Sequence, residues 1–591
     1  MASYNKSKEV ADLSFIDDSD SDEESFNCDI LEQDFEPESE DDEELKDDEG
    51  SEDDEGSEDN NASARHRHRR GVDNLDWKDR AYDYAWLGEF TERAGPTIHD
   101  VDSSITDIFL HFVDDKVLQH IVTETNRYAN KLIFIERNAG KLKNSTLKGW
   151  KDTDINEVRA FIAIMLGFGF DRRNSYENHW STHWFLEQPG LRKLMSRNRF
   201  TLILRCLHLA DNDAAPPRDD PSYDRGFKIR FFMSNLIANF QSAFSPSRNM
   251  SVDESVIAFL GRIWFKTYHP KKPHKQGMTV WTLADSKTGY IYNQDLFTGS
   301  DGLPDATQRT VMKLCEPIIG KKHHIYMDNY FSSPALFADL ANKSTGACGT
   351  LRTNRTGVPD RIKLANPAVG DSVFEQDGNQ LFVCWMDKRK VSLISTIHNS
   401  MTFQKQIRQR RGPNYCEIQK PCAIEFYTQN MGGVDRADRL IWTYLNIHKS
   451  LQWWKKVFVY LLEVSFVNAL IIYRSVHPNE HVRSDKLRLE LIDGLLKNFE
   501  RRPSRPGRRP TDPPQRLTER HFVSANKQRT PKGRTSEPDC IVCSKRGAGS
   551  KRHQTKFICG QCEKPMCPVP CFERYHTLID YKTNCTKEYH S

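Results

Sequence analysis

The order of strands and helices between residues 249 and 351 constrains the fold of this 591-residue chain more than any other feature. Five stretches predict strands because apolar and β-branched residues alternate or run together in them: 250–259, 278–284, 290–293, 324–327 and 348–351. Helical spacing of apolar residues follows the third and fourth of these strands, at 311–318 and 334–341. Three strands followed by helix, strand, helix and strand predict a mixed α/β sheet.

Four aspartates lie where this sheet could bring them together. Asp253 is on the first strand, Asp328 ends the fourth, and Asp435 and Asp438 open a helix after a Gly-Gly pair. Singly, each fits an ordinary strand-end or helix-start residue, since helix N-termini favour negative charge. Together they would form a set of hard oxygen ligands for Mg²⁺ or Mn²⁺, which suits phosphodiester displacement. Strand alternation does not decide whether Asp253 or Glu254 faces this site.

Helical patterns flank the predicted sheet on both sides. Residues 103–247 carry amphipathic repeats, and Asp154 and Glu157 form a capping pair for the apolar helix that follows. The most apolar run, 457–473, is interrupted by an acid and an amide and is shorter than a membrane span. We therefore interpret it as a buried helix.

The charge of the chain is strongly segregated. Residues 1–60 hold 27 Asp and Glu against 3 Lys and Arg, although the whole chain has a net charge of only +1. Residues 61–591 therefore carry an excess of Lys and Arg. A basic region of this kind points to a polyanionic partner, most plausibly nucleic acid. The acidic runs cannot bury enough apolar surface, so residues 1–102 are predicted to be disordered. Basic clusters at 65–70 and 501–509 are either nuclear signals or linkers, and no secretory signal precedes them.

The C-terminal segment has the cysteine spacing of a metal-binding module. The candidate ligands are Cys540, Cys543, Cys559, Cys562, Cys567, Cys571 and His576. Two Cys-x2-Cys pairs are typical of zinc, and an intracellular chain disfavours the alternative of disulfides. Seven ligands imply two zinc ions with one partner missing, which Cys585 or His590 could supply. Metal would hold together a segment that is too short for a large core.

Several motifs, in order along the chain, resemble the piggyBac family of DNA transposases. They are Met250-Ser-Val-Asp-Glu-Ser, Tyr326-Met-Asp-Asn-Tyr-Phe-Ser-Ser, Asn430-Met-Gly-Gly-Val-Asp-Arg-Ala-Asp, His448-Lys-Ser-Leu-Gln-Trp-Trp-Lys-Lys and Cys571-Phe-Glu-Arg-Tyr-His. The resemblance implies an RNase H-like core that is split by a β-rich insertion, together with a split, mostly helical dimerisation and DNA-binding domain. The implied divisions are 1–102 (acidic tail), 103–247 (first helical segment), 248–444 (core, insertion 353–420), 445–500 (second helical segment), 501–537 (basic linker) and 538–591 (zinc domain).

The resemblance also implies a mechanism and partners. Asp253, Asp328 and Asp435 would be the triad that holds Mg²⁺ or Mn²⁺, and Asp438 a further required aspartate. The implied activity is cut-and-paste transposition: excision of an element from double-stranded DNA through hairpin ends, and integration at TTAA sites. We expect a nuclear enzyme that acts at least as a homodimer, with neither a membrane nor a small-molecule substrate.

In the family, the zinc domain is an interleaved cross-brace that binds transposon-end DNA. By that resemblance we pair the first Cys-x2-Cys with Cys567 and Cys571, and the second with His576 and Cys585. A protein-reading zinc module is the alternative.

Four residues at the start of the long apolar helix are candidate DNA contacts. Trp453 or Trp454 could stack on an unpaired base of a hairpin, while Lys455 and Lys456 hold phosphate. The alternative is that both tryptophans belong to the core. For the whole chain, the four aspartates and the zinc ligands favour an active transposase. The alternatives are a domesticated DNA-binding protein without catalysis and a zinc-domain chromatin adaptor whose acidic tail recruits partners.

Overall fold

The structure is a computed structural model. It describes residues 86–97, 103–499, 520–578 and 581, apart from short gaps at 218, 221, 271, 273–274, 300–302, 409–414, 447–451, 532 and 545–551. The acidic tail, both basic clusters, Cys585 and His590 lie outside the described residues.

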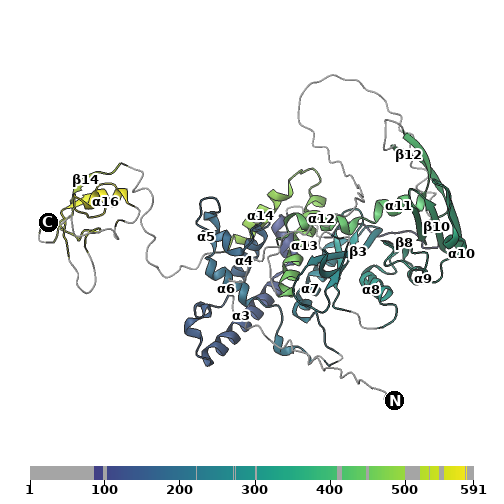
Figure 1. The fold of residues 1–591 in the computed structure, drawn as a ribbon, viewed down its shortest axis with the longest axis horizontal. Coiled ribbons are helices and arrows are strands. Elements are labelled where there is room, and N and C mark those ends of the chain that lie inside the picture. The colour runs from purple at the N-terminus through teal and green to yellow at the C-terminus, as the bar shows by residue number, and fades with distance from the viewer. Residues whose placement is uncertain are drawn as a thin grey trace, which may run out of the picture. The chain divides into compact units, whose positions relative to one another are not determined.

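The central sheet, which has helices before and after it in the chain, has nine strands, and Figure 1 labels β3 and β8 among them. Five of its strands run in the order β6–β5–β3–β7–β8. These strands are β3 (Asn249–Ala258), β5 (Gln276–Asp285), β6 (Ile291–Leu296), β7 (His324–Met327) and β8 (Gly346–Thr350). The pairs β6–β5 and β5–β3 are antiparallel, whereas β3–β7 and β7–β8 are parallel. This order is that of an RNase H-like core, and it confirms the predicted mixed α/β fold.

The segment predicted to be an insertion lengthens the same sheet. β11 (Lys390–Ser395) pairs antiparallel with β8, and β10 (Gln380–Met386) and β9 (Ser372–Asp377) follow it. Only β12 (Thr402–Arg408) and β13 (Tyr415–Pro421) form a hairpin of their own within the described residues. At the other edge, the short β4 (Thr267–Tyr268) pairs with β5. The sequence predicted the hairpin around 381–395 but not its place in the central sheet.

Helices precede, interrupt and follow the sheet. Those before it are α2 (Ile105–Phe112), α3 (Asp115–Asn138), α4 (Ile155–Gly167), α5 (Pro189–Leu194), α6 (Arg197–Cys206) and α7 (Phe227–Ala243). Those within or after it are α8 (Ala306–Cys315), α9 (Pro334–Asn342), α10 (Asp360–Leu364), α11 (Cys422–Asn430), α12 (Gly433–Tyr444), α13 (Trp453–Val476) and α14 (Ser484–Leu496). α4 begins as predicted, because the Asp154 carboxylate accepts from the Glu157 amide at 2.9 Å.

Helix α13 is the central helix of the helical region and packs against α2, α7 and α12. By length and composition alone it could cross a membrane, but 89% of its most apolar window is buried inside the protein. The acid that interrupts this apolar run, Glu463, is paired with Arg488 of α14 through two bonds of 2.6 and 2.8 Å. Arg488 also donates to the Leu166 carbonyl at the end of α4. This buried ion pair joins helices that precede the central sheet in the chain to helices that follow it.

The C-terminal module is small and rich in turns. It contains β14 (Val523–Ala525), which pairs antiparallel with β15 (Phe557–Cys559), and α16 (Cys571–Thr577). Its buried centre consists largely of cysteines, with Met566 and Tyr575. So small an apolar core needs additional cross-links to be stable.

Candidate active site and zinc clusters

The parallel pairing of β3 and β7 brings the first two aspartates side by side. Val252 lies opposite Met327 in the register, and the next residue on each strand is Asp253 and Asp328. Both side chains are half-buried, at the point where β7 ends. Because the two strands run the same way, the two aspartates lie at the same level along the sheet, an arrangement that the sequence left open.

Helix α12 covers the face of β3 that carries Asp253. Ser251 and Ser255 share this face with Asp253 by alternation. Gly433, at the start of α12, lies so close that an added Cβ would come within 2.3 Å of the Ser251 Oγ. Further along, the Ser255 hydroxyl donates to Asp438 Oδ1 at 2.7 Å. Asp253, rather than Glu254, therefore faces the helix of Asp435 and Asp438, and Gly433 is required for the approach.

Burial, with repulsion from neighbouring acids, raises the pKa of three acids in this cluster. Burial and then the neighbouring Glu254 raise the pKa of Asp253 well above its usual range. Burial, with Glu254 as a further contributor, also raises the pKa of Asp328. The pKa of Asp438 rises to about 7, mainly through burial, although the bond from Ser255 opposes the shift. Asp435 is exposed on the first turn of α12. Such a cluster favours the binding of a cation.

Lys272, in the loop between β4 and β5, is a charged neighbour that the sequence patterns did not reveal. Its ammonium donates to the Glu254 carbonyl at 3.1 Å and lies 4.0 Å from the Glu254 carboxylate. Burial alone would lower the pKa of Lys272, but Asp253, Glu254, Asp435 and Asp438 together raise it. Its only sequence signal was a Lys-Lys pair between two prolines, which is typical of an ordinary loop.

The donor set matches a hard divalent cation. Four carboxylates gather on one strand, one strand end and one helix turn, and burial, with Glu254 as a further contributor, raises the pKa of Asp253, Asp328 and Asp438. Mg²⁺ and Mn²⁺ prefer oxygen ligands of this kind and take part of their coordination from water and substrate phosphate. Asp253, Asp328 and Asp435 are the residues that could hold such ions.

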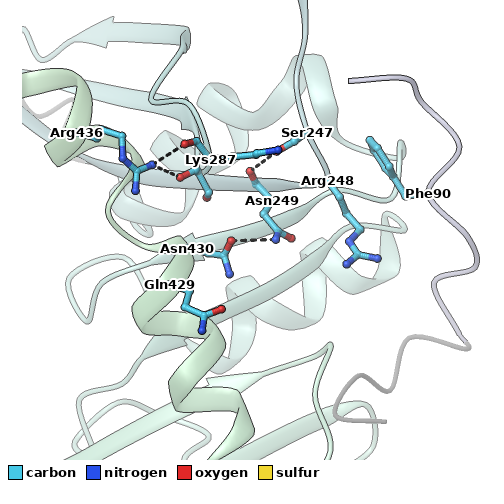
Figure 2. Close-up of a pocket in the computed structure, with 9 residues that line it drawn as sticks. Phe90, Ser247, Arg248, Asn249, Lys287, Gln429, Asn430 and Arg436 are labelled. Atoms are coloured by element: carbon cyan, nitrogen blue, oxygen red, sulfur yellow. Dashed lines mark hydrogen bonds between the residues drawn. The ribbon is translucent and has the colours of Figure 1, made fainter. Parts of the chain in front are cut away.

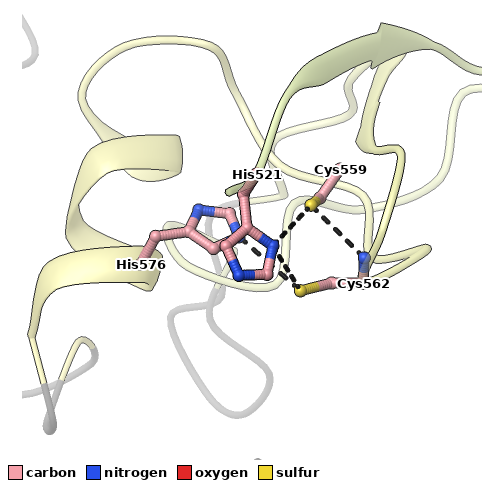
Figure 3. A group of neighbouring side chains, drawn as sticks. All are labelled: His521, Cys559, Cys562 and His576. Carbon is pink, nitrogen blue, oxygen red and sulfur yellow. Dashed lines mark hydrogen bonds between the residues drawn. The ribbon is translucent and has the colours of Figure 1, made fainter. Parts of the chain in front are cut away.

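The C-terminal module contains two clusters of four metal-type ligands, each with its ligand atoms within 4.8 Å of one another. Cys540, Cys543, Cys567 and Cys571 form the first. His521, Cys559, Cys562 and His576 form the second, which Figure 3 shows. The second pairs its histidine nitrogens with thiols at 3.4 to 3.6 Å: His521 Nδ1 with Cys562 Sγ, and His576 Nε2 with the same sulfur. Both sets have the composition of structural zinc sites.

A hydrogen bond fixes the ring of His576 in this cluster. Its Nδ1 lies 2.7 Å from the Phe572 carbonyl one turn earlier in α16, so Nδ1 carries the proton and Nε2 faces the thiols. Along the chain the ligands alternate between clusters, with His521 before the first Cys-x2-Cys. That alternation is the cross-brace implied by the family resemblance.

Comparison with known proteins identifies the family. A family model described as Transposase IS4 matches residues 104–470, more than half of the chain, and one described as a DDE_Tnp_1-like zinc finger matches 517–577. PiggyBac transposable element-derived protein 5 from Homo sapiens is 26% identical over 407 residues, which cover 65% of this chain and 74% of that protein. The chain belongs to the piggyBac family of transposases.

A second human relative and a solved structure agree with this assignment. PiggyBac transposable element-derived protein 2 from Homo sapiens is 26% identical over 400 residues, covering 64% of this chain and 63% of that protein. A cryo-EM structure of a piggyBac transposase synaptic complex with hairpin DNA matches with a TM-score of 0.60 and 22% identity, over 81% of this chain and 99% of that one. The likeness extends the piggyBac fold over most of the chain.

Within this piggyBac-type chain, the zinc ligands differ from the predicted set at one position. The first cluster is the predicted one, whereas His521 fills the place in the second for which Cys585 was proposed. Cys585 and the alternative His590 lie outside the described residues. His521 was missed because it stands 38 residues before Cys559, inside the stretch interpreted as linker. The short apolar run Phe522-Val523 beside it was the available signal.

Of the four candidate DNA contacts at the start of α13, three are buried or hydrogen-bonded within this chain: Trp454, Lys455 and Lys456. Trp454 is 3% exposed and packs beside His208, so a base cannot reach it. The Lys455 ammonium donates to the Leu204 carbonyl at 2.6 Å, and that of Lys456 to the Ala258 carbonyl at 3.1 Å. Base stacking therefore stays a hypothesis for Trp453 alone, which is half-buried against Phe265.

Proposed function

We propose that this chain is a metal-dependent DNA transposase that cuts and joins DNA at the carboxylate cluster. The observation that carries the proposal is the parallel register that sets Asp253 beside Asp328, with Ser255 bonded to Asp438 on the facing helix. These acids come from segments far apart in the sequence and meet beside the carboxyl end of β7. Ordinary strand-end residues have no reason to converge in this way.

The chemistry would be in-line displacement at phosphorus. Divalent ions held by Asp253, Asp328 and Asp435 would activate a water or a DNA 3′-hydroxyl and stabilise the leaving oxygen. Asp438, held by Ser255, would orient the first turn of α12, and Lys272 would balance part of the charge near the scissile phosphate. The same site could serve strand cleavage, hairpin formation and joining to a TTAA target, since each step displaces an oxygen at phosphorus.

The zinc module would recognise transposon ends. Two zinc ions would hold the two clusters, and the last 91 residues carry 20 Lys and Arg against 8 Asp and Glu, which favours phosphate contact. A homodimer on paired ends and nuclear localisation belong to the same proposal. Size-exclusion chromatography with light scattering, and imaging of a tagged chain, test these two points.

Excision of a matched donor tests the catalytic proposal. We expect the wild-type chain to excise, and Asp253→Asn and Asp435→Asn to lose excision by more than about a hundredfold while still binding transposon-end DNA. Asp360→Asn is the matched control, because Asp360 is exposed on α10 and its carboxylate pairs only with Lys363 among the described residues. Equal excision by the wild type and the Asp253 variant would refute the proposal.

A DNA-binding protein without catalysis is the second candidate. Both human relatives above carry names that describe them as derived from transposable elements. This candidate predicts end binding with no excision from any donor by the wild-type chain. Inverted repeats bounded by TTAA around the coding region would favour the active enzyme instead.

A further inference from the structure

A polar pocket lies on the same face of β3 as the carboxylates, beyond the start of α12. Its cavity is about 580 Å³, and it is formed by the start of β3, the turn between β5 and β6, the end of α11 and the first turns of α12. Figure 2 shows Arg436 on one side, Arg248 and Phe90 on the other, and Asn249 and Asn430 between them. Asn249 and Asp253 are four residues apart on the strand, which is about 13 Å.

The pocket is positively charged. Arg248, Lys287 and Arg436 line it, and none of the other described lining residues is an acid. The remaining groups are amides, hydroxyls and the ring of Phe90. Three cations line the pocket, and the acid nearest to it in the turn, Asp285, is buried and bonded to backbone amides, so the pocket favours an anionic ligand.

The hydrogen bonds that fix the turn between β5 and β6 do not involve the hydroxyl of Ser286. The Asp285 carboxylate accepts from the amides of Lys287 and Thr288 at 3.0 and 2.8 Å, and Arg436 donates to the carbonyls of Ser286 and Lys287. These bonds fix the turn without the Ser286 side chain. That side chain is 2% exposed, and its hydroxyl has no hydrogen-bond partner in the described part of the chain.

A second buried polar atom without a hydrogen-bond partner among the described residues belongs to Asn249, which also lines the pocket. The Asn249 amide donates to Asn430 Oδ1 at 3.0 Å, and Asn430 donates in turn to the Phe426 carbonyl, which fixes the orientation of both amides. Asn249 Oδ1 is then buried, with no donor among the described residues. Buried polar atoms without partners are rare and indicate a ligand or ordered water.

We propose that this pocket binds a backbone phosphate of the DNA strand that enters the active site. The inference rests on the proposed function and adds a second DNA contact on the catalytic core. Asn249, which lines the pocket, is about 13 Å along β3 from Asp253, so a few nucleotides of one DNA strand span both. Arg436 follows Asp435 directly, so a phosphate held there also fixes the first turn of α12 and the position of the Asp435 carboxylate.

Two substitutions test the pocket because they separate folding from binding. Ser286→Ala removes a hydroxyl that the fold does not use, so the thermal midpoint of the free protein should be unchanged or higher. Its affinity for transposon-end DNA should fall about threefold. Lys287→Gln should weaken binding about three- to tenfold and reduce the salt slope, log K against log salt, by about one.

The matched control is Lys343→Gln, which removes an exposed lysine after α9 that lines no part of the pocket. Replacing single phosphates by neutral methylphosphonates should weaken the wild type at one position and leave Lys287→Gln unaffected there. Wild-type affinity and salt slope in both pocket variants would overturn the inference. Equally, stabilisation of the wild type but not Lys287→Gln by inorganic phosphate, with DNA binding unchanged, would make this a small-anion site. If the wild type bound no DNA at all, the proposed function itself would fail.

Discussion

The Ser255 hydroxyl donates to Asp438 Oδ1 at 2.7 Å, and this bond ties strand β3 to helix α12. Behind Ser255, Thr282 and Gln294 continue the polar contacts, and Gln294 reaches the Tyr460 hydroxyl of α13 at 2.9 Å. Asp438 is thus held by a series of polar contacts that ends at helix α13. Its protonation state should therefore influence stability as well as catalysis.

Replacing Asp438 should change the pH dependence of stability in metal-free protein. The pKa of Asp438 is about 7 in the folded chain, against 3.8 for an ordinary aspartate. The folded state then binds more protons between these values, so this group costs stability as the pH rises from 4 to 7. Asp438→Asn, which still accepts from Ser255, should stabilise the protein by about 2 to 4 kcal/mol at pH 8.

The same substitution should change stability by less than about 1 kcal/mol at pH 4, because the carboxyl is protonated in the folded state there and is close to its ordinary pKa of 3.8 in the unfolded state. Denaturant unfolding in EDTA at both pH values measures the difference. Equal effects at pH 4 and pH 8 would show that Asp438 is ionised normally. Asp360→Asn is the control, because Asp360 is exposed on α10. Its effect on stability at the two pH values is the baseline against which the effect of Asp438→Asn is compared.

Removing the charge of Lys272 should tighten metal binding to the free protein. Lys272 interacts with Asp253, Glu254, Asp435 and Asp438, so Lys272→Ala leaves that cluster one charge more negative. Mn²⁺ affinity should then rise about five- to tenfold, on the order of 1 kcal/mol. Lys272→Arg keeps the charge and should bind Mn²⁺ as the wild type does. Calorimetric titration decides the point, and weaker binding by the alanine variant would mean that Lys272 mainly holds the loop in place.

Much of the fold and of the carboxylate site follows from local sequence patterns. Alternation identified β3, and the acid at the end of a short apolar run placed Asp328 at the end of β7. A mixed sheet can place its first and fourth strands side by side, so the sequence allowed Asp253 and Asp328 to meet, but the pairing of β3 with β7 came only from the structure. The cap at Asp154 was predictable too, whereas the partner of Glu157, Arg199, was not.

What could not be predicted depends on contacts between distant segments. The pairing of β11 with β8 is a choice of sheet edge that a strand pattern does not encode. Ser255 and Lys272 are ordinary polar residues until α12 and the β4–β5 loop fold onto β3. His521 lies far from its cysteines in sequence, and the burial of Trp454 depends on helix packing around α13.

The two tryptophans at the start of α13 should respond differently to substitution. Trp454 is buried beside His208, so Trp454→Ala should cost about 3 to 5 kcal/mol of stability. Trp453 is half-buried, and Trp453→Ala should cost clearly less. Denaturant midpoints for the two variants give the comparison. A larger loss for Trp453 would contradict this placement.

Zinc content should distinguish His521 from Cys585 as the eighth ligand. The wild-type chain should hold two zinc ions, measured by atomic absorption after dialysis. His521→Ala removes a ligand whose Nδ1 lies 3.5 and 3.4 Å from the thiols of Cys559 and Cys562, so one ion should be lost or weakly held. Cys585→Ser should keep both ions.

His553→Ala is the matched control, because His553 is in the same module but in neither cluster. It should keep two ions. Loss of one ion from Cys585→Ser, with two retained by His521→Ala, would restore the ligand set first proposed from the sequence. The two clusters are interleaved along the chain, so loss of one zinc ion should also lower the thermal midpoint of the module. This holds whether His521 or Cys585 is the eighth ligand.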